Sequence, residues 1–301
     1  MSFSGNTKEE ICRQKPDRLC CATAESYGVL LFCHTFAPDG IRITTANQAF
    51  AGRLPKLFKK AFGLSFDVLP PENAAGKRSF LITDETKISR IYATFGDNAG
   101  SSLVHHVNYA VLEEDCCRIS FLRGAFLAGG SVTDPEKRYH LELATTHRQV
   151  ERETFTLMQE LGFSPKESAR GGNALLYFKQ SDAIADFLTA IGAPVTGMAV
   201  ITARVDKEMR NTITRQINCD SANADKTVAA AQEQLTAIRR YAALYGLDSL
   251  PEALKNAALL RITNPAASLA DLARLSYPAV TKSCLSHRLK KIADLVQEEN
   301  E

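Results

Sequence analysis

The sequence has no stretch typical of a membrane protein or an exported protein. No apolar run reaches the roughly 18 residues that a transmembrane helix needs. The N-terminal segment KEEICRQKPDR is charged, whereas a signal peptide is apolar. These absences predict a cytoplasmic protein that does not enter a membrane.

The chain also has little net charge. Its 36 basic and 34 acidic side chains leave a formal charge of +2 over 301 residues. Any nucleic-acid interface must therefore arise from local clustering of Lys and Arg. With 45% hydrophobic and 23% charged residues, the composition is typical of two or three small globular units.

The C-x-x-C motif of many metal sites is missing as well. Of the eight cysteines, Cys20–Cys21 and Cys116–Cys117 are adjacent pairs and the others are scattered. We interpret them as small apolar residues in helices, and we expect no bound metal and no cofactor. A zinc site formed by Cys20–Cys21 with Cys33–His34 is the alternative.

The most informative segment present is Arg118–Val132, RISFLRGAFLAGGSV. Its apolar residues recur at helical spacing, and it carries the small residues Gly124, Ala125, Ala128 and Gly129. Gly in a helix interior costs about 1 kcal/mol relative to Ala, a cost that is offset when another backbone must approach closely. The segment therefore predicts a close crossing of two helices. The alternative is a helix that simply ends at Gly129–Gly130.

The order of the predicted elements repeats along the chain. The second copy comprises helix Ile119–Gly129, strand His140–Thr146, helix His147–Leu161, strand Ala174–Lys179 and helix Ser181–Ile191. The first copy comprises helix Ala24–Cys33, strand Ile41–Thr45, helix Gln48–Phe62, strands Leu64–Leu69 and Arg78–Thr83, and helix Lys87–Phe95. This order predicts two copies of one αββαββα unit, with the helices that open each copy as equivalents.

That pairing resembles the LAGLIDADG homing endonucleases, in which two signature helices pack at a pseudo-two-fold axis. One family in particular is similar, the WhiA regulators of Gram-positive bacteria. The similar segments are FLRGAFLAGGSVTDPEKRYHLE at Phe121–Glu142, KEMRNTITRQINCDSANADKTVAAA at Lys207–Ala231 and SLADLARLSYPAVTKSCLSHRLKKIADL at Ser268–Leu295. The resemblance covers nearly the whole chain and is weakest between Phe36 and Val111.

The resemblance and the repeat together imply an α+β fold. A pseudo-two-fold LAGLIDADG-like αββαββα repeat domain is expected at residues 1–203, with repeats at about 1–112 and 113–203, and an all-α helix-turn-helix domain at residues 221–301. Residues 204–220 are expected to form an ordered linker, either a short helix or an ordered polar crossing. Its arginines either bind phosphate or pair with the Asp and Glu beside them.

In the homing endonucleases, an acidic residue near the end of each signature helix holds the divalent metal. The motif places this position at Gly129 in the second copy and near Cys33 in the first. Neither residue supplies the hard oxygen ligand that Mg²⁺ requires. The resemblance therefore implies a domain without nuclease activity, and we predict no catalytic residues. The alternative is an active nuclease or another enzyme that binds a ligand in the cleft between the repeats.

The C-terminal part is predicted to be helical. A bundle seam with spacings of three and four is formed by Val228, Ala231, Leu235, Ile238, Ala242 and Tyr245. Ser249-x-x-Glu252 and Ser268-x-x-Asp271 are expected capping boxes of two short helices. A last helix begins near Thr281 or Ser283, with Leu285, Leu289, Ile292 and Val296 as its core stripe.

Two helices joined by a tight turn are typical of a helix-turn-helix, whose second helix enters the major groove with its N-terminal residues. We predict that the DNA-binding residues are Thr281, Lys282, Ser283, Ser286, His287, Arg288, Lys290 and Lys291. The pattern alone also fits a structural three-helix bundle with a solvated basic face. WhiA proteins typically have Gly and Asn where this chain has Cys284 and Ser286. Because Ser cannot make the bidentate contact of Asn to adenine, this departure implies a different target preference.

The resemblance also implies a function. It is that of a sequence-specific DNA-binding transcriptional regulator linked to cell division, chromosome segregation and sporulation. The expected partners are double-stranded DNA at promoter regions and a protein such as another transcription regulator or a sigma factor. The expected location is the cytoplasm, in association with the nucleoid.

Overall fold

The computed structural model describes residues 2–16, 18–71, 76–96 and 104–297. The outer limits of the predicted domains, residues 1 and 301, lie outside these ranges. The chain divides into two compact units, Met1–Lys207 and Glu208–Glu301. The first combines helices with two antiparallel sheets and the second is helical, so the predicted α+β fold class is confirmed.

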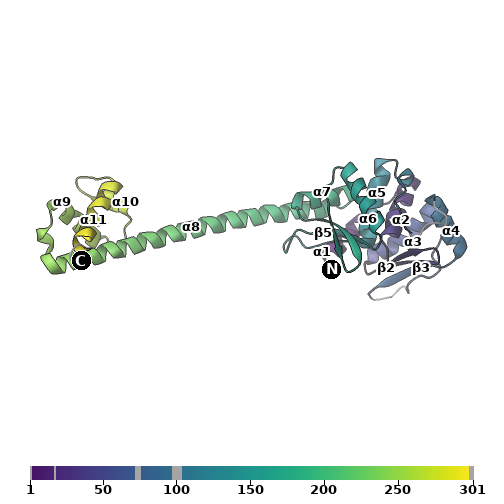
Figure 1. Cartoon of the computed structure of the whole chain (residues 1–301), viewed down its shortest axis with the longest axis horizontal. Coiled ribbons are helices and arrows are strands. Elements are labelled where there is room, and N and C mark those ends of the chain that lie inside the picture. The colour runs from purple at the N-terminus through teal and green to yellow at the C-terminus, as the bar shows by residue number, and fades with distance from the viewer. Residues whose placement is uncertain (1, 17, 72–75, 97–103, 298–301) are drawn as a thin grey trace. The chain divides into compact units, whose positions relative to one another are not determined.

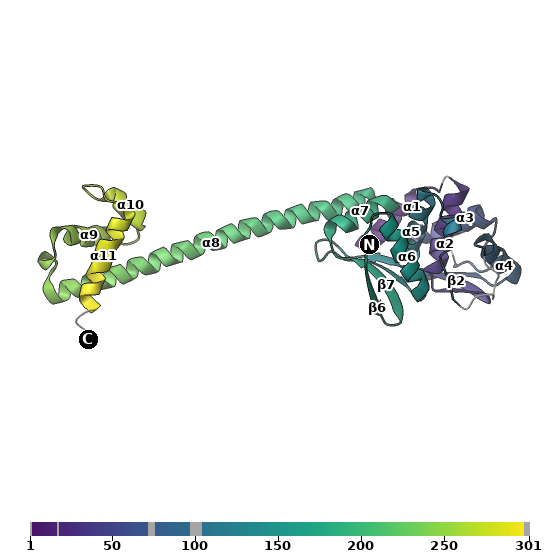
Figure 2. The same ribbon diagram turned by 45° about the horizontal axis from the view of Figure 1, so that its top comes forward.

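The first unit contains the predicted repeat. After helix α1 (Phe3–Arg13), the first copy consists of α2 (Leu19–Leu31), β1 (Thr35–Ala37), β2 (Gly40–Thr45), α3 (Gln48–Phe62), β3 (Arg78–Ile82) and α4 (Glu85–Thr94). A short 3₁₀ turn, η1 (Tyr109–Val111), precedes the second copy. This copy consists of α5 (Asp115–Gly129), β4 (Gly130–Val132), β5 (Leu141–Thr145), α6 (Arg148–Glu160), β6 (Lys166–Arg170), β7 (Asn173–Phe178) and α7 (Ser181–Ile191). Figure 2 shows β6 and β7 side by side as a hairpin.

The predicted strand Leu64–Leu69 is wrong. The strand order is β1-β2-β3 in the first sheet and β4-β5-β7-β6 in the second. The segment Leu64–Leu69 therefore corresponds to β6 of the second sheet. Within it only Val68 forms a β-bridge, with Leu81. The Asp67 carboxylate accepts hydrogen bonds from the backbone N–H groups of Thr83 and Asp84, at 2.7 and 2.9 Å. A side chain therefore substitutes for the ladder. Pro70 and Pro71 follow and lack the N–H groups that would continue it.

The two helices that open the repeats cross at very short distance, as the small residues predict. A Cβ added to Gly124 of α5 would lie 2.0 Å from the Glu25 carbonyl oxygen of α2. A Cβ added to Gly28 of α2 would lie 2.0 Å from the Phe121 carbonyl oxygen of α5. The same sequence offset separates Gly28 from Gly124 and Glu25 from Phe121, so the contact is symmetric about the pseudo-two-fold axis. Figure 1 shows α2 and α5 side by side in the first unit.

Residues 204–220, predicted as an ordered linker, belong to one long helix, α8 (Pro194–Tyr245). Arg204 forms an ion pair with Asp182 of α7. Between residues 208 and 226 every side chain of α8 is exposed. No helix among the described residues is long and apolar enough to cross a membrane.

The predicted seam on α8 is only partly right. Ala231, Leu235 and Ile238 are buried, whereas Val228 and Tyr245 are 50% and 42% exposed. Tyr241 takes the place of Tyr245 in the core of the second unit. The seam is therefore confined to the central turns, because the helices that cover it do not reach both ends of the predicted stripe.

The second unit continues from α8 with a 3₁₀ turn η2 (Leu247–Ser249) and helices α9 (Glu252–Thr263), α10 (Leu269–Leu275) and α11 (Lys282–Gln297), which are visible in Figure 2. The capping box at Ser268 is confirmed, since its hydroxyl oxygen accepts the Asp271 N–H at 3.2 Å. The box at Ser249 is wrong. Pro251 is the N-cap residue of α9, and the Ser249 hydroxyl donates to the Gly246 carbonyl instead.

Candidate nucleic-acid interface

Helices α10 and α11 are joined by a tight turn at residues 276–281. The Ser276 hydroxyl donates to the Ala273 carbonyl at 2.8 Å, and its oxygen accepts the Val280 N–H at 3.1 Å. The Thr281 hydroxyl then accepts the Cys284 N–H at 3.2 Å, which caps the first turn of α11. Side chains within the turn therefore fix the direction in which α11 leaves it.

The core stripe predicted for the last helix is confirmed. Leu285, Leu289, Ile292 and Val296 are each at most 5% exposed and pack in the core of the second unit. Because a helix presents its opposite face half a turn away, this packing leaves one side of α11 in solvent. Ser283 and His287 lie one turn apart on that outer side, and both are exposed.

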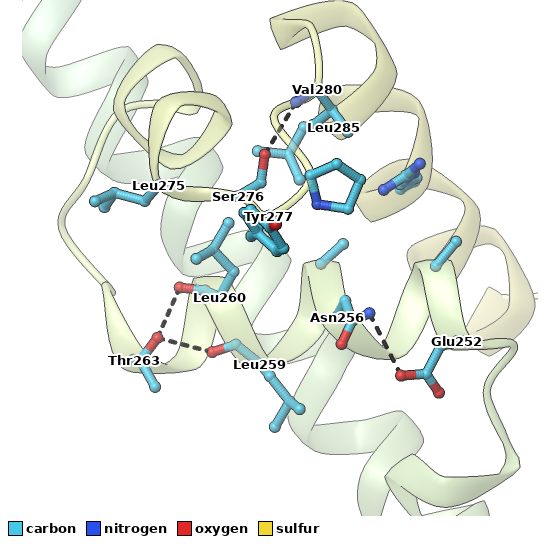
Figure 3. Close-up of a pocket in the computed structure, with 14 residues that line it drawn as sticks. Glu252, Asn256, Leu259, Leu260, Thr263, Leu275, Ser276, Tyr277, Val280 and Leu285 are labelled. Carbon is cyan, nitrogen blue, oxygen red and sulfur yellow. Dashed lines mark hydrogen bonds between the residues drawn. The ribbon is translucent and has the colours of Figure 1, made fainter.

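The predicted DNA-binding residues are not all on that outer face. Ser286 and Lys290 line a hollow of about 660 Å³ beside α8, together with Arg240. Arg288 lines a groove of about 560 Å³ on the opposite flank of α11. Figure 3 shows this groove, with Leu259 and Leu260 from α9 and Ser276 and Tyr277 from the turn. Ser286 and Arg288 are half-buried, whereas the other predicted residues are exposed.

Lys282 lies at the start of α11, where it has a basic neighbour that the sequence did not suggest. Lys282 and Lys226 of α8 line the same hollow, of about 210 Å³. Both side chains are exposed. Two ammonium groups beside the first turn of α11 are suited to a phosphate group, whose negative charge is also favoured at a helix N-terminus. The sequence did not indicate Lys226, because Lys282 is far from it in the sequence. Only the packing of α8 within the second unit brings the two lysines close together.

Arg261 is the second residue that sequence reasoning missed. Although charged, it is only 1% exposed. Its guanidinium donates to the Gln234 side-chain oxygen of α8 at 3.0 Å and to the Ala267 carbonyl, just before α10, at 2.6 Å. Burial lowers the pKa of Arg261. Periodicity was a usable signal, because Arg261 continues the buried face of Leu254, Ala257 and Ala258.

We expect Arg261→Met to lower the stability of the second unit by about 2–3 kcal/mol, because it leaves two half-buried oxygens without their charged donor. The matched control is Arg274→Met on α10, since the Arg274 side chain is 82% exposed. Urea unfolding followed by circular dichroism measures the difference. Equal unfolding midpoints for the two variants would show that Arg261 does not hold α8, α9 and the start of α10 together.

The ends of the crossing helices hold no carboxylate at the positions that bind metal in the homing endonucleases. Cys33 follows α2, and its thiol lies 3.1 Å from the Leu30 carbonyl and 3.3 Å from the Thr35 carbonyl. Burial raises the pKa of the Cys33 thiol to about 12. A Cβ added to Gly129 of α5 would lie 2.3 Å from the Ala144 carbonyl oxygen, so no larger side chain fits there.

One carboxylate lies within the helix crossing, but it is fully paired. Glu25 of α2 is 0% exposed, and its two oxygens accept a bidentate pair of hydrogen bonds from Arg53 of α3, at 2.6 and 2.7 Å. Arg123 of α5 lies 3.7 Å from the same carboxylate. This buried network ties α2, α3 and α5 together and gives Glu25 a structural role.

Comparison with known proteins places both units in one family. Residues 118–210 match the model described as "WhiA LAGLIDADG-like domain", and residues 213–296 match the "WhiA C-terminal HTH domain". The "Probable cell division protein WhiA" of Ruminiclostridium cellulolyticum is 35% identical over 305 residues, which cover 99% of this chain and 97% of that protein. The chain belongs to the WhiA family. The protein of the same description from Alkaliphilus metalliredigens is 33% identical over 312 residues, or 99% of this chain and 98% of its own length.

A solved WhiA structure supports the fold. The crystal structure of full-length DUF199/WhiA from "Thermatoga maritima" matches with a TM-score of 0.60 at 22% identity, over 99% of each chain. The WhiA LAGLIDADG-like model begins at residue 118 and therefore covers the second repeat only. The first repeat has the same element order in the structure, except that it has no strand in the place of β6. The helix-turn-helix of WhiA is a DNA-binding motif, and its second helix here is α11.

Proposed function

We propose that this protein is a sequence-specific DNA-binding transcriptional regulator that reads DNA with α11. The observation that supports this most is the outward face of α11, where Ser283 and His287 are exposed at the N-terminal half of a helix whose opposite face is fully buried. In helix-turn-helix proteins these positions reach base edges in the major groove.

The remaining predicted residues take different roles in this proposal. Lys282, with Lys226 beside it, binds backbone phosphate and sets the position of α11 on the duplex. Ser283 and His287 contact base edges, which are the contacts that distinguish one sequence from another. Ser286, Arg288 and Lys290 lie on the flanks of α11. In this proposal they contact the walls of the DNA major groove or the phosphates at its edges.

The names of the relatives support a biological setting for this activity. The relatives described above are named as probable cell division proteins, and we propose that this protein regulates genes of cell division, with chromosome segregation and sporulation as further processes. It acts at promoters in the nucleoid. A second transcription regulator or a sigma factor is the proposed protein partner.

Genome-wide mapping of bound DNA tests the proposal, with a His287→Ala strain as the comparison. We expect discrete wild-type peaks at promoters that share a sequence motif. Loss of a base contact costs about 1–3 kcal/mol at one base position, so the variant should show weaker peaks and a motif relaxed at one place. Uniform coverage of the chromosome by the wild-type protein would contradict sequence-specific regulation.

We further propose that the LAGLIDADG-like unit has lost nuclease activity. Gly129 and Cys33 occupy the metal-binding positions, and the buried Glu25 is held by Arg53 and Arg123. A two-metal mechanism needs hard oxygen ligands at these positions. The competing function is an active or ligand-binding enzyme of the homing-endonuclease type.

Purified full-length protein should not nick or cut supercoiled plasmid in Mg²⁺ or Mn²⁺. The matched control is a Gly124→Asp variant purified in the same way, because its disrupted helix crossing should abolish any cleavage that this unit performs. Cleavage that copurifies with the wild-type protein and disappears with this variant would establish the enzyme.

A further inference from the structure

Four cysteines meet where the two crossing helices begin. Cys20 and Cys21 are the second and third residues of α2, and Cys116 and Cys117 are the second and third residues of α5. The same sequence offset that relates Gly28 to Gly124 relates the two pairs, so the pseudo-two-fold axis brings equivalent positions together. We call these four residues the cysteine cluster.

The spacing of the sulfur atoms suits a single metal ion. All four Sγ atoms of the cysteine cluster lie within 4.8 Å of one another. Bonds of about 2.3 Å from Zn²⁺ to four thiolates at tetrahedral angles place the sulfurs about 3.8 Å apart. The side chains therefore need only small rotations to reach this geometry. An iron–sulfur cluster bonds each thiolate to one of several iron atoms and would require the sulfurs to lie farther apart.

The surroundings of the cluster favour the charge of such a site. Four thiolates around one Zn²⁺ carry two net negative charges. The N-terminal ends of α2 and α5 each contribute roughly half a positive elementary charge, and the cysteines lie in the first turn of both helices. Arg18, the N-cap residue of α2, contacts the Cys116 side chain and adds a full positive charge.

Burial and access are also suited to a structural metal. Cys117 is 3% exposed, and Cys21 and Cys116 are half-buried, so the site is partly shielded from water. Cys20 is exposed, which leaves a path for the ion to enter. The Sγ of Cys21 lies 3.9 Å from the Cys116 carbonyl oxygen, so the two chain segments already contact each other directly.

We propose that the cysteine cluster binds one Zn²⁺ ion as a tetrathiolate and so ties the N-terminal ends of α2 and α5 together. The ion replaces the four thiol protons, which pass to solvent. No oxidant or reductant is involved. The site lies at the opposite ends of α2 and α5 from Cys33 and Gly129, and it serves stability rather than catalysis.

The test uses the full chain, produced with zinc in the medium and purified with a non-chelating, non-thiol reductant. Elemental analysis should find about one zinc per chain. Replacement of zinc by Co²⁺ should give the intense sulfur-to-cobalt absorption of a tetrathiolate. Removal of zinc with a strong chelator should lower the temperature at which the first unit unfolds, and added Zn²⁺ should restore it.

Two variants distinguish zinc binding by the cysteine cluster from zinc binding by other cysteines. Cys20→Ser should weaken zinc binding by more than about tenfold, since even the loss of a group that only contacts a metal ligand costs about that much. Because Cys20 is exposed, we expect the substitution to leave folding unchanged. Cys219→Ser, at an exposed position of α8, should bind zinc as the unchanged chain does. Zinc-free protein without the cobalt absorption would overturn the proposal. So would disulfides linking the two cysteine pairs in protein purified under reductant, or equal zinc binding by the two variants.

Discussion

Gly124→Ala should destabilise the first unit by more than about 3 kcal/mol, although it adds a single methyl group. The new Cβ would lie 2.0 Å from the Glu25 carbonyl oxygen, and this neighbour is backbone, which cannot rotate away. The two helices must separate, and separation also disturbs the buried pairs of Glu25 with Arg53 and Arg123. For a unit of this size, such a loss lowers Tm by on the order of 10 °C. The larger substitution Gly124→Leu should destabilise the unit further, because it adds three more carbon atoms at the same contact.

The matched control is Gly52→Ala in α3. Nothing lies within 4 Å of a Cβ at Gly52, and Ala is favoured over Gly in a helix by up to about 1 kcal/mol. This variant should therefore be as stable as the unchanged chain or slightly more stable. Thermal unfolding by circular dichroism measures both variants, and unfolding of the second unit serves as an internal reference. Equal Tm values for the two variants would contradict the close crossing.

The repeat and the helix crossing could be predicted because their signals are local. Small residues at helical spacing around Gly124 indicate a close approach whatever the partner is. In the partner helix α2, Gly28 is the one glycine, with Ala24 one turn before it, so the signal there is weaker. Strand Leu64–Leu69 could not be predicted correctly, because its hydrophobic pattern is that of a strand while the hydrogen bonds of Asp67 replace most of the ladder.

The periodicity of the sequence predicts which side of α11 is buried, but it does not predict where the polar residues of this helix lie. Ser286, Lys290 and Arg288 lie on the flanks only because α8 and α9 pack there. The pairing of Lys282 with Lys226 depends on the same packing. The cysteine cluster shows this limit most clearly. Spacing rules search one segment for C-x-x-C, but here the pseudo-two-fold axis brings two distant adjacent pairs together.

A fragment of residues 208–301 should fold alone and bind specific DNA, whereas a fragment of residues 1–207 should bind at least about a hundredfold more weakly. The second unit has its own core, to which Ile238, Leu254, Leu272 and Leu289 contribute from α8, α9, α10 and α11. It also contains every predicted DNA-binding residue. The match to the helix-turn-helix family model, residues 213–296, likewise lies within the second unit.

Within the 208–301 fragment, Lys282→Ala and His287→Ala should affect DNA binding in different ways. Loss of a phosphate contact weakens binding to all sequences about equally and reduces the slope of log affinity against log salt by about one. Loss of a base contact leaves that slope unchanged and costs about 1–3 kcal/mol at one base position. Salt titrations on the target and on single-base variants of it separate the two effects.

The charge-matched control is Lys255→Ala on α9, which removes one positive charge outside the predicted site. Lys255 forms an ion pair with Asp248 at 2.7 Å, so its loss should change neither the salt slope nor the base preference. If Lys255→Ala lowers the slope as much as Lys282→Ala does, the affinity reflects overall charge rather than contacts at α11. If the 1–207 fragment retains most of the affinity and specificity, the LAGLIDADG-like unit reads the DNA, and α11 belongs to a structural bundle.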